Sequence, residues 1–293
     1  MNLAESLIEL PLPQLVVQGR GVQVCYQDVV ALSVSQLVFR GHTIAIVGQN
    51  GAGKSTLIKA MLNLLPLNKG ILTLKQHEGR KSTVLDPAQH MAFCPESGAV
   101  FADISVESYL KLWCRIKHRN PQYYRRAPRD YLEELDLSPL LSKLGRQLSK
   151  GQRRRVQTAV GFLIAPKLFL FDEPFDGLDV QQTNKLTELI RSHERDMTFV
   201  ISSHRMDVVE RLADYVIVLG AGEVCAHGDV TAVCRTLAGE SVVIDVRDAS
   251  ASLAHRLQAK LPQHIVTQIG PQIFITGHTS DHTLLSRLIT QEH

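Results

Sequence analysis

The stretch Thr43–Thr56, which reads TIAIVGQNGAGKST, decides the fold that this chain is expected to adopt. Its opening residues, Thr43–Val47, are apolar or β-branched and are typical of a buried strand. Gly48–Ser55 follows at once and matches the pattern G-x-x-x-x-G-K-S, and Thr56–Leu65 is helical by pattern and is stopped by Pro66. A glycine-rich turn between a strand and a helix predicts a loop that holds phosphate groups.

The residue types of this loop suit that task. Glycines let successive backbone N–H groups point at phosphate oxygens, and the following helix adds the positive end of its dipole. Lys54 is expected to reach the β- and γ-phosphates, and the Ser55 hydroxyl to take a position on Mg²⁺. The motif indicates a nucleoside triphosphatase without separating kinases, GTPases, motors and pumps. The loop residues predicted to bind ATP are Gly48, Gln49, Asn50, Gly51, Ala52, Gly53, Lys54, Ser55 and Thr56.

A second apolar stretch, Leu168–Pro174 (LFLFDEP), ends in two acidic residues. A buried parallel strand delivers its last residues to the carboxyl edge of the sheet, beside the phosphate loop. Asp172 is therefore expected to hold Mg²⁺, directly or through water, and Glu173 to polarise a water for attack on the γ-phosphate. An acidic turn at a strand end is common by itself, but together with the phosphate loop it favours a catalytic pair.

Charge is unevenly distributed along the chain. Lys111–Arg155 holds 13 Lys and Arg against 4 Asp and Glu, an excess of +9 in a chain whose net charge is +3. This excess predicts a basic face, which is either a solvated helical surface or a face near anionic lipid headgroups or an acidic partner. The overall charge does not point to nucleic acid.

Cysteine spacing and apolar runs restrict the class of protein further. The five cysteines form no CxxC pair, which disfavours a disulfide framework or a zinc site and favours a reducing compartment. The N-terminus lacks the basic region and the long apolar run of a signal peptide. The most apolar segment is broken at Pro166-Lys167, well short of the ~18 residues that a spanning helix needs. The chain is therefore expected not to cross a membrane by itself.

Short apolar bursts predict the remaining elements. Residues 14–39 alternate as in an antiparallel meander, 104–147 resemble several helices, and 216–228 resemble a hairpin turned at Ala221-Gly222. Further strands are predicted at 71–75 and 197–202, a helix at 180–195, and alternating strand-like and helix-like pieces (SVVIDVR, ASLAHRLQAKL, QIFITG, HTLLSRLIT) in the last 55 residues. The predicted class is α/β: a P-loop NTPase core with a mostly parallel sheet, an N-terminal antiparallel β-subdomain, a helical subdomain and a short C-terminal α/β tail.

Three motifs together resemble one known family. Gly48–Thr56, LSKGQ (148–152) and LFDEP (170–174) look like the Walker A, signature and Walker B segments of the nucleotide-binding subunit of an ATP-binding cassette (ABC) transporter. Tyr26 lies where that family places an aromatic residue that stacks on adenine. Asp179 matches the last aspartate of its D-loop, and His204 matches its switch histidine, which contacts the γ-phosphate. The resemblance covers roughly residues 14–230.

The resemblance implies a division of the chain and a second copy of it. An N-terminal extension is expected over 1–13, an ABC ATPase domain over 14–238 with its helical subdomain at about 97–150, and a small C-terminal extension over 239–293. In this family two cassettes pack head to tail, so that each ATP lies between one phosphate loop and the partner's signature. The residues expected to contact the partner's ATP are Ser149, Gly151, Gln152 and Asp179. The expected catalytic residues are Glu173, His204 and Lys54, with ATP and Mg²⁺ as cofactors.

Two positions depart from the family's pattern. Lys150 stands where the signature most often has Gly, and Ser149 and Gly151 keep the nucleotide contacts. Glu96 aligns with the glutamine of the family's Q-loop and is expected as a third metal-binding residue beside Ser55 and Asp172. The three arginines after the signature, Arg153–Arg155, are expected in the first turns of the following helix, some packed and some solvated.

The resulting prediction is an ATPase subunit that powers transport by an integral membrane permease on a separate chain. It would work as a homodimer, peripherally at the cytoplasmic face of the membrane, with export favoured over import and no nucleic acid as partner. The alternative is a soluble ABC ATPase that acts on nucleic acid or ribosomes, which the basic stretch keeps open. The transported substrate is not encoded in these residues, because the cassette does not touch cargo.

Overall fold

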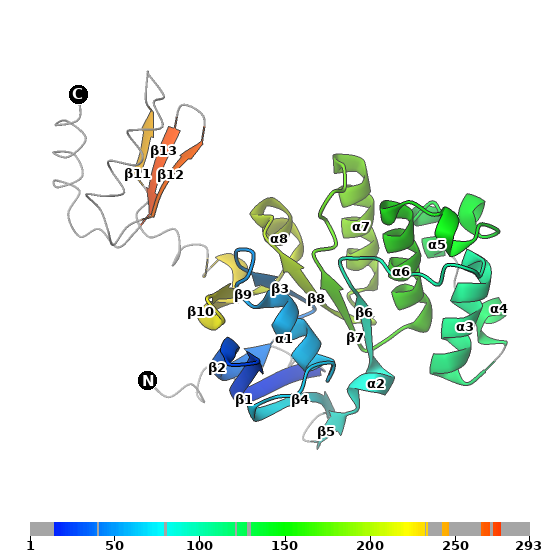
Figure 1. Ribbon diagram of the computed structural model, residues 1–293, viewed down its shortest axis with the longest axis horizontal. Helices are drawn as coiled ribbons and strands as arrows, with labels where there is room; N and C mark the ends of the chain where they lie inside the picture. The colour runs from blue at the N-terminus through cyan, green and yellow to red at the C-terminus, as the bar shows by residue number, and fades with distance from the viewer. Residues whose placement is uncertain are drawn as a thin grey trace. The chain divides into compact units, whose positions relative to one another are not determined.

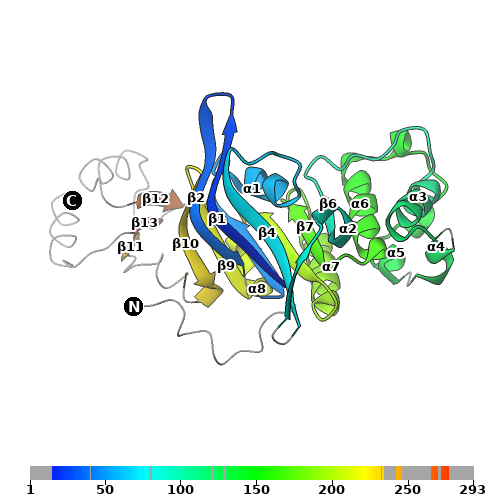
Figure 2. The same ribbon diagram turned by 90° about the horizontal axis from the view of Figure 1, so that it is seen from below.

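Two sheets and the helices around them form the larger part of the molecule (Figures 1 and 2). The structure, a computed structural model, describes residues 15–39, 41–78, 81–120, 122–127, 130–231, 233, 242–245, 265–269 and 272–276. Its contacts divide the chain into two units, Met1–Gly228 and Asp229–His293, and each is described by itself. The predicted boundary at residue 238 and the predicted extension over 1–13 lie outside the described residues.

The first sheet is antiparallel and is made by the N-terminal part of the chain. Its strands, in the order β2-β1-β4-β5, are β1 (Leu15–Tyr26), β2 (Val29–Phe39), β4 (Lys69–Glu78) and β5 (Lys81–Leu85). Side chains of β1 and β2 alternate between buried and exposed, so one face of the sheet packs into the core. The predictions of an antiparallel meander over 14–39 and of a strand at 71–75 are confirmed.

The second sheet is mostly parallel and carries the phosphate loop. Its strands, in the order β10-β9-β3-β8-β7-β6, are β3 (Thr43–Val47), β6 (Met91–Cys94), β7 (Leu168–Asp172), β8 (Thr198–Ser203), β9 (Tyr215–Gly220) and β10 (Glu223–Asp229). Parallel pairing joins β6 to β7, β7 to β8, β8 to β3 and β3 to β9. The predicted α/β class is therefore confirmed.

Other elements cover both faces of this sheet. A strand that is apolar at consecutive positions, such as β7 over 168–171, requires this, because its side chains point alternately to the two faces. Leu168 and Leu170 of β7 pack into the core shared with the antiparallel sheet and with α1 (Lys54–Met61). Phe169 and Phe171, which point the other way, pack into the core shared with helices α6 (Lys150–Ile164) and α7 (Val180–His193). The remaining helices beside the sheet are α2 (Pro87–His90) and α8 (Met206–Leu212).

Residues between β6 and α6 form a helical segment, as predicted for 104–147. It contains α3 (Val106–His118), α4 (Tyr123–Arg126), α5 (Asp130–Glu134) and two 3₁₀ turns, η1 (Ser138–Leu140) and η2 (Gly145–Gln147). Ser105 caps α3 by accepting a hydrogen bond from the Ser108 N–H. In both ribbon views this segment lies at the end of the first unit away from β9 and β10.

Helix α1 is shorter than predicted, because it ends at Met61 instead of Leu65. Asn63 adopts a left-handed conformation with φ 56°, and the Leu64 N–H bonds back to the Lys59 carbonyl. A left-handed residue with such a backward hydrogen bond ends a helix. The chain thus turns before Pro66 can act as the stop. Helix α7 likewise ends at His193, two residues before the predicted end at 195.

The described part of the second unit is a three-stranded antiparallel sheet in the order β11-β13-β12. Strands β11 (Val242–Asp245) and β13 (Gln272–Thr276) confirm the strands predicted in SVVIDVR and QIFITG. Strand β12 (Ile265–Ile269) was not predicted. The two helices predicted in ASLAHRLQAKL and HTLLSRLIT lie outside the described residues.

Candidate ATP-binding and hydrolysis site

The phosphate loop connects the end of β3 to the start of α1, and its glycines are required by its shape. Gly51 and Gly53 have φ values of 84° and 101°, which side-chain-bearing residues rarely adopt. Gly48 is needed for space, because a Cβ there would lie 2.4 Å from the Leu219 carbonyl oxygen. Sequence and backbone geometry therefore agree on a tight loop at the amino end of a helix.

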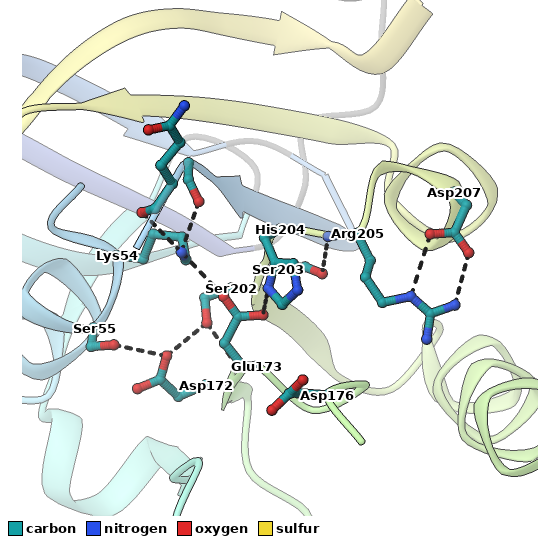
Figure 3. A network of polar contacts seen from close by, with 12 residues as sticks. Lys54, Ser55, Asp172, Glu173, Asp176, Ser202, Ser203, His204, Arg205 and Asp207 are labelled. Atoms are coloured by element: carbon teal, nitrogen blue, oxygen red, sulfur yellow. Dashed lines mark hydrogen bonds and ion pairs between the residues drawn. The ribbon is translucent and has the colours of Figure 1, made fainter. Parts of the chain in front are cut away.

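Lys54 joins this loop to the acidic end of β7 (Figure 3). Its Nζ donates to the carbonyl oxygens of Gly48 and Gln49, at 2.8 and 3.3 Å. The same Nζ lies 3.1 Å from Glu173 Oε1, and the two side chains are only 6% and 13% exposed. Two residues predicted as catalytic from separate motifs thus form an ion pair in a shielded position.

Asp172 and Ser55, both predicted as metal-binding, are also in contact. Ser55 Oγ donates to Asp172 Oδ1 at 3.0 Å. Mg²⁺ in nucleotide sites usually takes one or two protein oxygens and completes its shell with phosphate oxygens and water. These two oxygens fit that requirement. No group of three or more His, Cys, Asp or Glu that could hold a metal ion occurs in the described part of the chain.

Ser202, at the end of β8, was not predicted as a site residue. Its buried hydroxyl donates to Asp172 Oδ1 at 2.7 Å and accepts from the Glu173 N–H at 2.8 Å. It therefore fixes both acidic residues, because β8 pairs with β7 so that Ser202 lies opposite Asp172. The feature of the sequence that could have identified Ser202 is a hydroxyl residue near the end of a largely apolar strand.

His204 completes the chain of contacts (Figure 3). Its Nδ1 lies 3.0 Å from Glu173 Oε2, so the Glu173 carboxylate is held between His204 and Lys54. Glu173 itself has φ 49°, an uncommon value for a residue with a side chain. Strained backbone of this kind persists where the surroundings hold it, and it is enriched at functional sites. The three predicted catalytic residues are thus brought together.

An open pocket of about 590 Å³ lies over this cluster. Tyr26, Val29 and Val30 from the end of the β1–β2 hairpin line it, and they are 46%, 68% and 48% exposed. Exposed aromatic and apolar side chains provide a face on which a flat base can stack. The predicted residues that line this pocket are Tyr26, Asn50, Gly51, Gly53, Lys54, Ser55, Thr56, Glu96 and Glu173.

The Ala221-Gly222 turn between β9 and β10 supports the phosphate loop and was not predicted to do so. Both residues have positive φ and line the pocket. The Gly222 N–H donates to the Ala52 carbonyl, and the Gly222 carbonyl accepts from the Ser33 N–H. The turn therefore braces the loop against β2. The hairpin was predictable from its pattern, but this contact was not.

The residues predicted to act across a dimer do not line this pocket. Ser149 caps α6 in a reciprocal pair with Gln152: each accepts a hydrogen bond from the other's N–H, at 3.2 and 3.0 Å. Gly151 is exposed, and a Cβ there would meet nothing within 4 Å. Asp179 caps α7 by accepting from the Gln182 N–H at 2.8 Å. Their assignment to a partner's ATP stays a prediction.

The three arginines after the signature lie in the first two turns of α6, as predicted, but none is fully solvated. Arg153 Nε donates to the Gly145 carbonyl, and Arg155 Nη1 donates to the Leu135 carbonyl. Arg154 is buried and donates to the carbonyls of Glu173 and Asp176. The packed position expected for some of the three is thus that of Arg154, whereas Arg153 and Arg155 are half-buried and bind backbone carbonyls of neighbouring segments.

Cys94, at the end of β6 near Asp172, is not a candidate nucleophile or metal ligand. Burial raises the pKa of its thiol to about 11, so the thiol stays neutral at physiological pH. It lies 3.7 Å from the Thr158 hydroxyl.

Residues 32–176 match the ABC transporter family. Linearmycin resistance ATP-binding protein LnrL of Bacillus subtilis (strain 168) is 26% identical over 77% of this chain and 73% of its own length. ATP-binding cassette sub-family A member 2 of Homo sapiens is 27% identical over 69% of this chain. That match spans only 8% of the human protein, so the chain corresponds to a small part of this longer relative.

Solved structures of ABC transporter proteins also resemble this chain. An ATP-binding subunit of an ABC transporter superposes with a TM-score of 0.66 at 25% identity, covering 75% of this chain and 92% of that one. A bacterial Atm1-family ABC exporter with ATP bound superposes with a TM-score of 0.64 at 20% identity, covering 78% of this chain and 41% of that one. The second likeness shows the fold alone.

Fold and site together define a nucleoside triphosphatase built on a phosphate loop. The chain belongs to the ABC transporter family, as a nucleotide-binding subunit. Domains of this family bind and hydrolyse ATP, and they work in pairs with membrane domains. In the part of the chain that the structure describes, no helix is long and apolar enough to cross a membrane.

Proposed function

We propose that this chain binds ATP with Mg²⁺, hydrolyses it, and thereby powers transport across a membrane by a permease on a separate chain. The observation that carries the proposal is the pairing of Lys54 with Glu173 at 3.1 Å beneath an open pocket. A phosphate-binding lysine and a carboxylate that can activate water meet where a γ-phosphate would lie.

Each residue of the cluster then has a role. Tyr26 stacks on adenine, and the loop Gly48–Thr56 surrounds the phosphates. Ser55, Asp172 and Glu96 are the residues that would hold Mg²⁺, which when bound would supply positive charge beside the transferred phosphoryl group. When the γ-phosphate arrives, it competes for Lys54 and frees Glu173 Oε1 to accept a proton from the attacking water. His204, already beside the other oxygen of Glu173, contacts the γ-phosphate.

A second copy of the chain would complete the site. Ser149, Gly151, Gln152 and Asp179 stand at the starts of two helices, where N–H groups and helix dipoles favour anions. They do not line the pocket of their own chain, which suits a role toward the partner's ATP. ATP would then join two cassettes, and hydrolysis would release them.

An open groove between α3, α6 and the start of β6 is the proposed contact for the permease. It has a volume of about 420 Å³ and is lined mainly by apolar side chains, among them Leu64, Phe93 and Trp113. Leu64, which is 61% exposed, adds its side chain to this contiguous apolar lining, and a contiguous apolar surface of this kind marks a contact site. A short amphipathic helix from the membrane chain is the occupant of matching chemistry.

Replacing Leu64 with Asp tests this partner. We expect the variant to bind ATP normally but to lose its association with the permease, because a charge would be placed in an apolar contact. Ile71→Asp is the matched control, since Ile71 is 67% exposed on β4 and does not line the groove. The measurement is co-purification from detergent-solubilised membranes with an integral membrane protein that stimulates ATP hydrolysis. Tight, salt-sensitive RNA or DNA binding without any such membrane protein would contradict the proposal.

The direction of transport is proposed as export, with the chain held peripherally at the cytoplasmic face. The support is the likeness to a linearmycin resistance ATP-binding protein. Transport assays in vesicles of known orientation, with ATP supplied on one side, test the direction.

Glu96 is proposed as a functional substitute for a glutamine, because both side chains offer an oxygen to a metal. We expect Glu96→Gln to keep substantial ATPase activity and Glu96→Ala to lose about 10-fold, a typical effect of removing a group that orients a metal. Steady-state phosphate release at saturating ATP is the measurement, and Glu133→Ala, at an exposed position on α5, is the control. Wild-type activity in Glu96→Ala would mean that the alignment or the role is wrong.

A further inference from the structure

Arg154 is a buried cation that lies directly behind the catalytic glutamate. Its side chain is 8% exposed, and it belongs to the second turn of α6. Nη2 donates to the Glu173 carbonyl at 2.5 Å, and Nη1 donates to the Asp176 carbonyl at 2.6 Å. The guanidinium thus spans the two ends of the turn that follows β7, in which the Asp176 N–H also bonds to the Glu173 carbonyl.

The burial of the Arg154 charge is unfavourable for the stability of the fold, so stability alone does not explain it. Within the described residues, no carboxylate lies within ion-pair distance of Arg154, and its Nε has no hydrogen-bond partner. A buried charge without a counter-charge costs free energy that backbone carbonyls offset only in part. A long apolar side chain such as Met would fill much of the same space without burying a charge. The two short hydrogen bonds to the catalytic turn are what such a side chain could not provide.

The contact holds a residue whose backbone conformation is uncommon. Glu173 has φ 49°, a strained conformation that persists only when neighbouring groups hold it. Ser202 Oγ holds its N–H, and Arg154 holds its carbonyl. Both sides of Glu173 are therefore fixed, and with them the direction in which its carboxylate points toward Lys54 and His204.

The same arginine fixes this turn to a second functional segment. Helix α6 begins at the Ser149 cap, on the surface proposed to meet a partner's ATP. Gly98, two residues after Glu96, packs so closely on the helix that a Cβ there would lie 3.0 Å from the Arg154 N. The first two turns of α6 thus contact the segments that carry Glu96 and Glu173.

We propose that Arg154 is a positioning residue, which holds the backbone of Glu173 so that its carboxylate can activate the attacking water. This inference rests on the proposed function, in which Glu173 acts on water. Arg154 does not touch the nucleotide pocket itself, so its loss is expected to slow hydrolysis without weakening ATP binding.

The test compares Arg154→Met and Arg154→Lys with Arg155→Met. Arg155 is the matched control, because it is the next residue of the same helix and binds Leu135 and Asp136 instead of the catalytic turn. We expect Arg154→Met to lower kcat about 10- to 100-fold while the Kd for a fluorescent ATP analogue changes less than about threefold. Arg154→Lys should regain part of the rate, and Arg155→Met should stay within about threefold of wild type.

A double-mutant cycle separates positioning from general support of the fold. In single-turnover measurements, Arg154→Met should have no further effect once Glu173 is Gln, because the carboxylate that it positions is gone. An equal loss in both backgrounds, or a folded Arg154→Met with wild-type kcat, would overturn the inference. If Arg154→Met does not fold, Arg154→Lys is measured in its place. A folded Arg154→Lys with wild-type kcat would also overturn the inference. A wild-type protein that hydrolyses no ATP would instead defeat the proposed function.

Discussion

Replacing Glu173 with Gln is expected to lower the rate of ATP hydrolysis about 1,000-fold and to trap an ATP-bound dimer. A general base contributes roughly 100- to 10,000-fold to such reactions, and an amide cannot accept the proton of the attacking water. The side chain keeps its length, so its contact with His204, at 3.0 Å in the native site, can be preserved. ATP binding therefore continues while the step that would release the dimer is blocked.

Two measurements check this prediction. Steady-state phosphate release gives the rate, and size-exclusion chromatography with light scattering gives the mass with and without ATP. The control is Glu188→Gln, because Glu188 is exposed on α7 and makes no contact with the site. Normal hydrolysis by Glu173→Gln would remove the assignment of the base, and a variant that stays monomeric with ATP would argue against the two-cassette arrangement.

Residues in the phosphate loop and at the end of β7 were predictable because short local patterns determine them. Gly51 and Gly53 are dictated by a backbone with positive φ, and Lys54 and Ser55 follow at fixed spacing. Asp172 and Glu173 end an apolar strand, and the carboxyl ends of parallel strands meet at one edge of the sheet. Neither prediction needed any knowledge of distant contacts.

Ser202 and Arg154 were not predicted, because their roles depend on contacts between distant segments. Ser202 reaches Asp172 only through the register in which β8 pairs with β7. Arg154 reaches the turn at Glu173 only through the packing of α6 on the sheet. In the sequence alone Arg154 is one of three adjacent arginines, and its burial distinguishes it.

The site also shows why Glu173 needs more than its own motif. Its N–H, its carbonyl and both carboxylate oxygens are contacted by residues from other elements: Ser202, Arg154, Lys54 and His204. A carboxylate that must activate water has to be held at a fixed distance from the γ-phosphate, and errors of about 1 Å cost about 100-fold in rate. The surrounding sheet and helices, and not the Walker B segment by itself, provide that accuracy.

Replacing Lys54 with Met is expected to weaken ATP binding at least about 100-fold and to abolish measurable hydrolysis. Lys54 is the only cation among the described residues that line the pocket, so its loss leaves the β- and γ-phosphates without a positive side chain. Its partners in the native site are the carbonyls of Gly48 and Gln49 and the carboxylate of Glu173. Water in the open pocket can replace the ammonium group at these oxygens, and Glu173 keeps its contact with His204. The variant is therefore expected to fold.

Thermal unfolding with and without MgATP measures the loss directly, because a ligand stabilises the state that binds it. Wild-type protein at 100 times its Kd should gain about 2.7 kcal/mol, whereas a 100-fold weaker variant at the same concentration should gain only about 0.4 kcal/mol. Lys59→Met is the control, since Lys59 lies in the last turn of the same helix and does not line the pocket. If Lys54→Met showed the wild-type gain with MgATP, the phosphate loop would not be the nucleotide site.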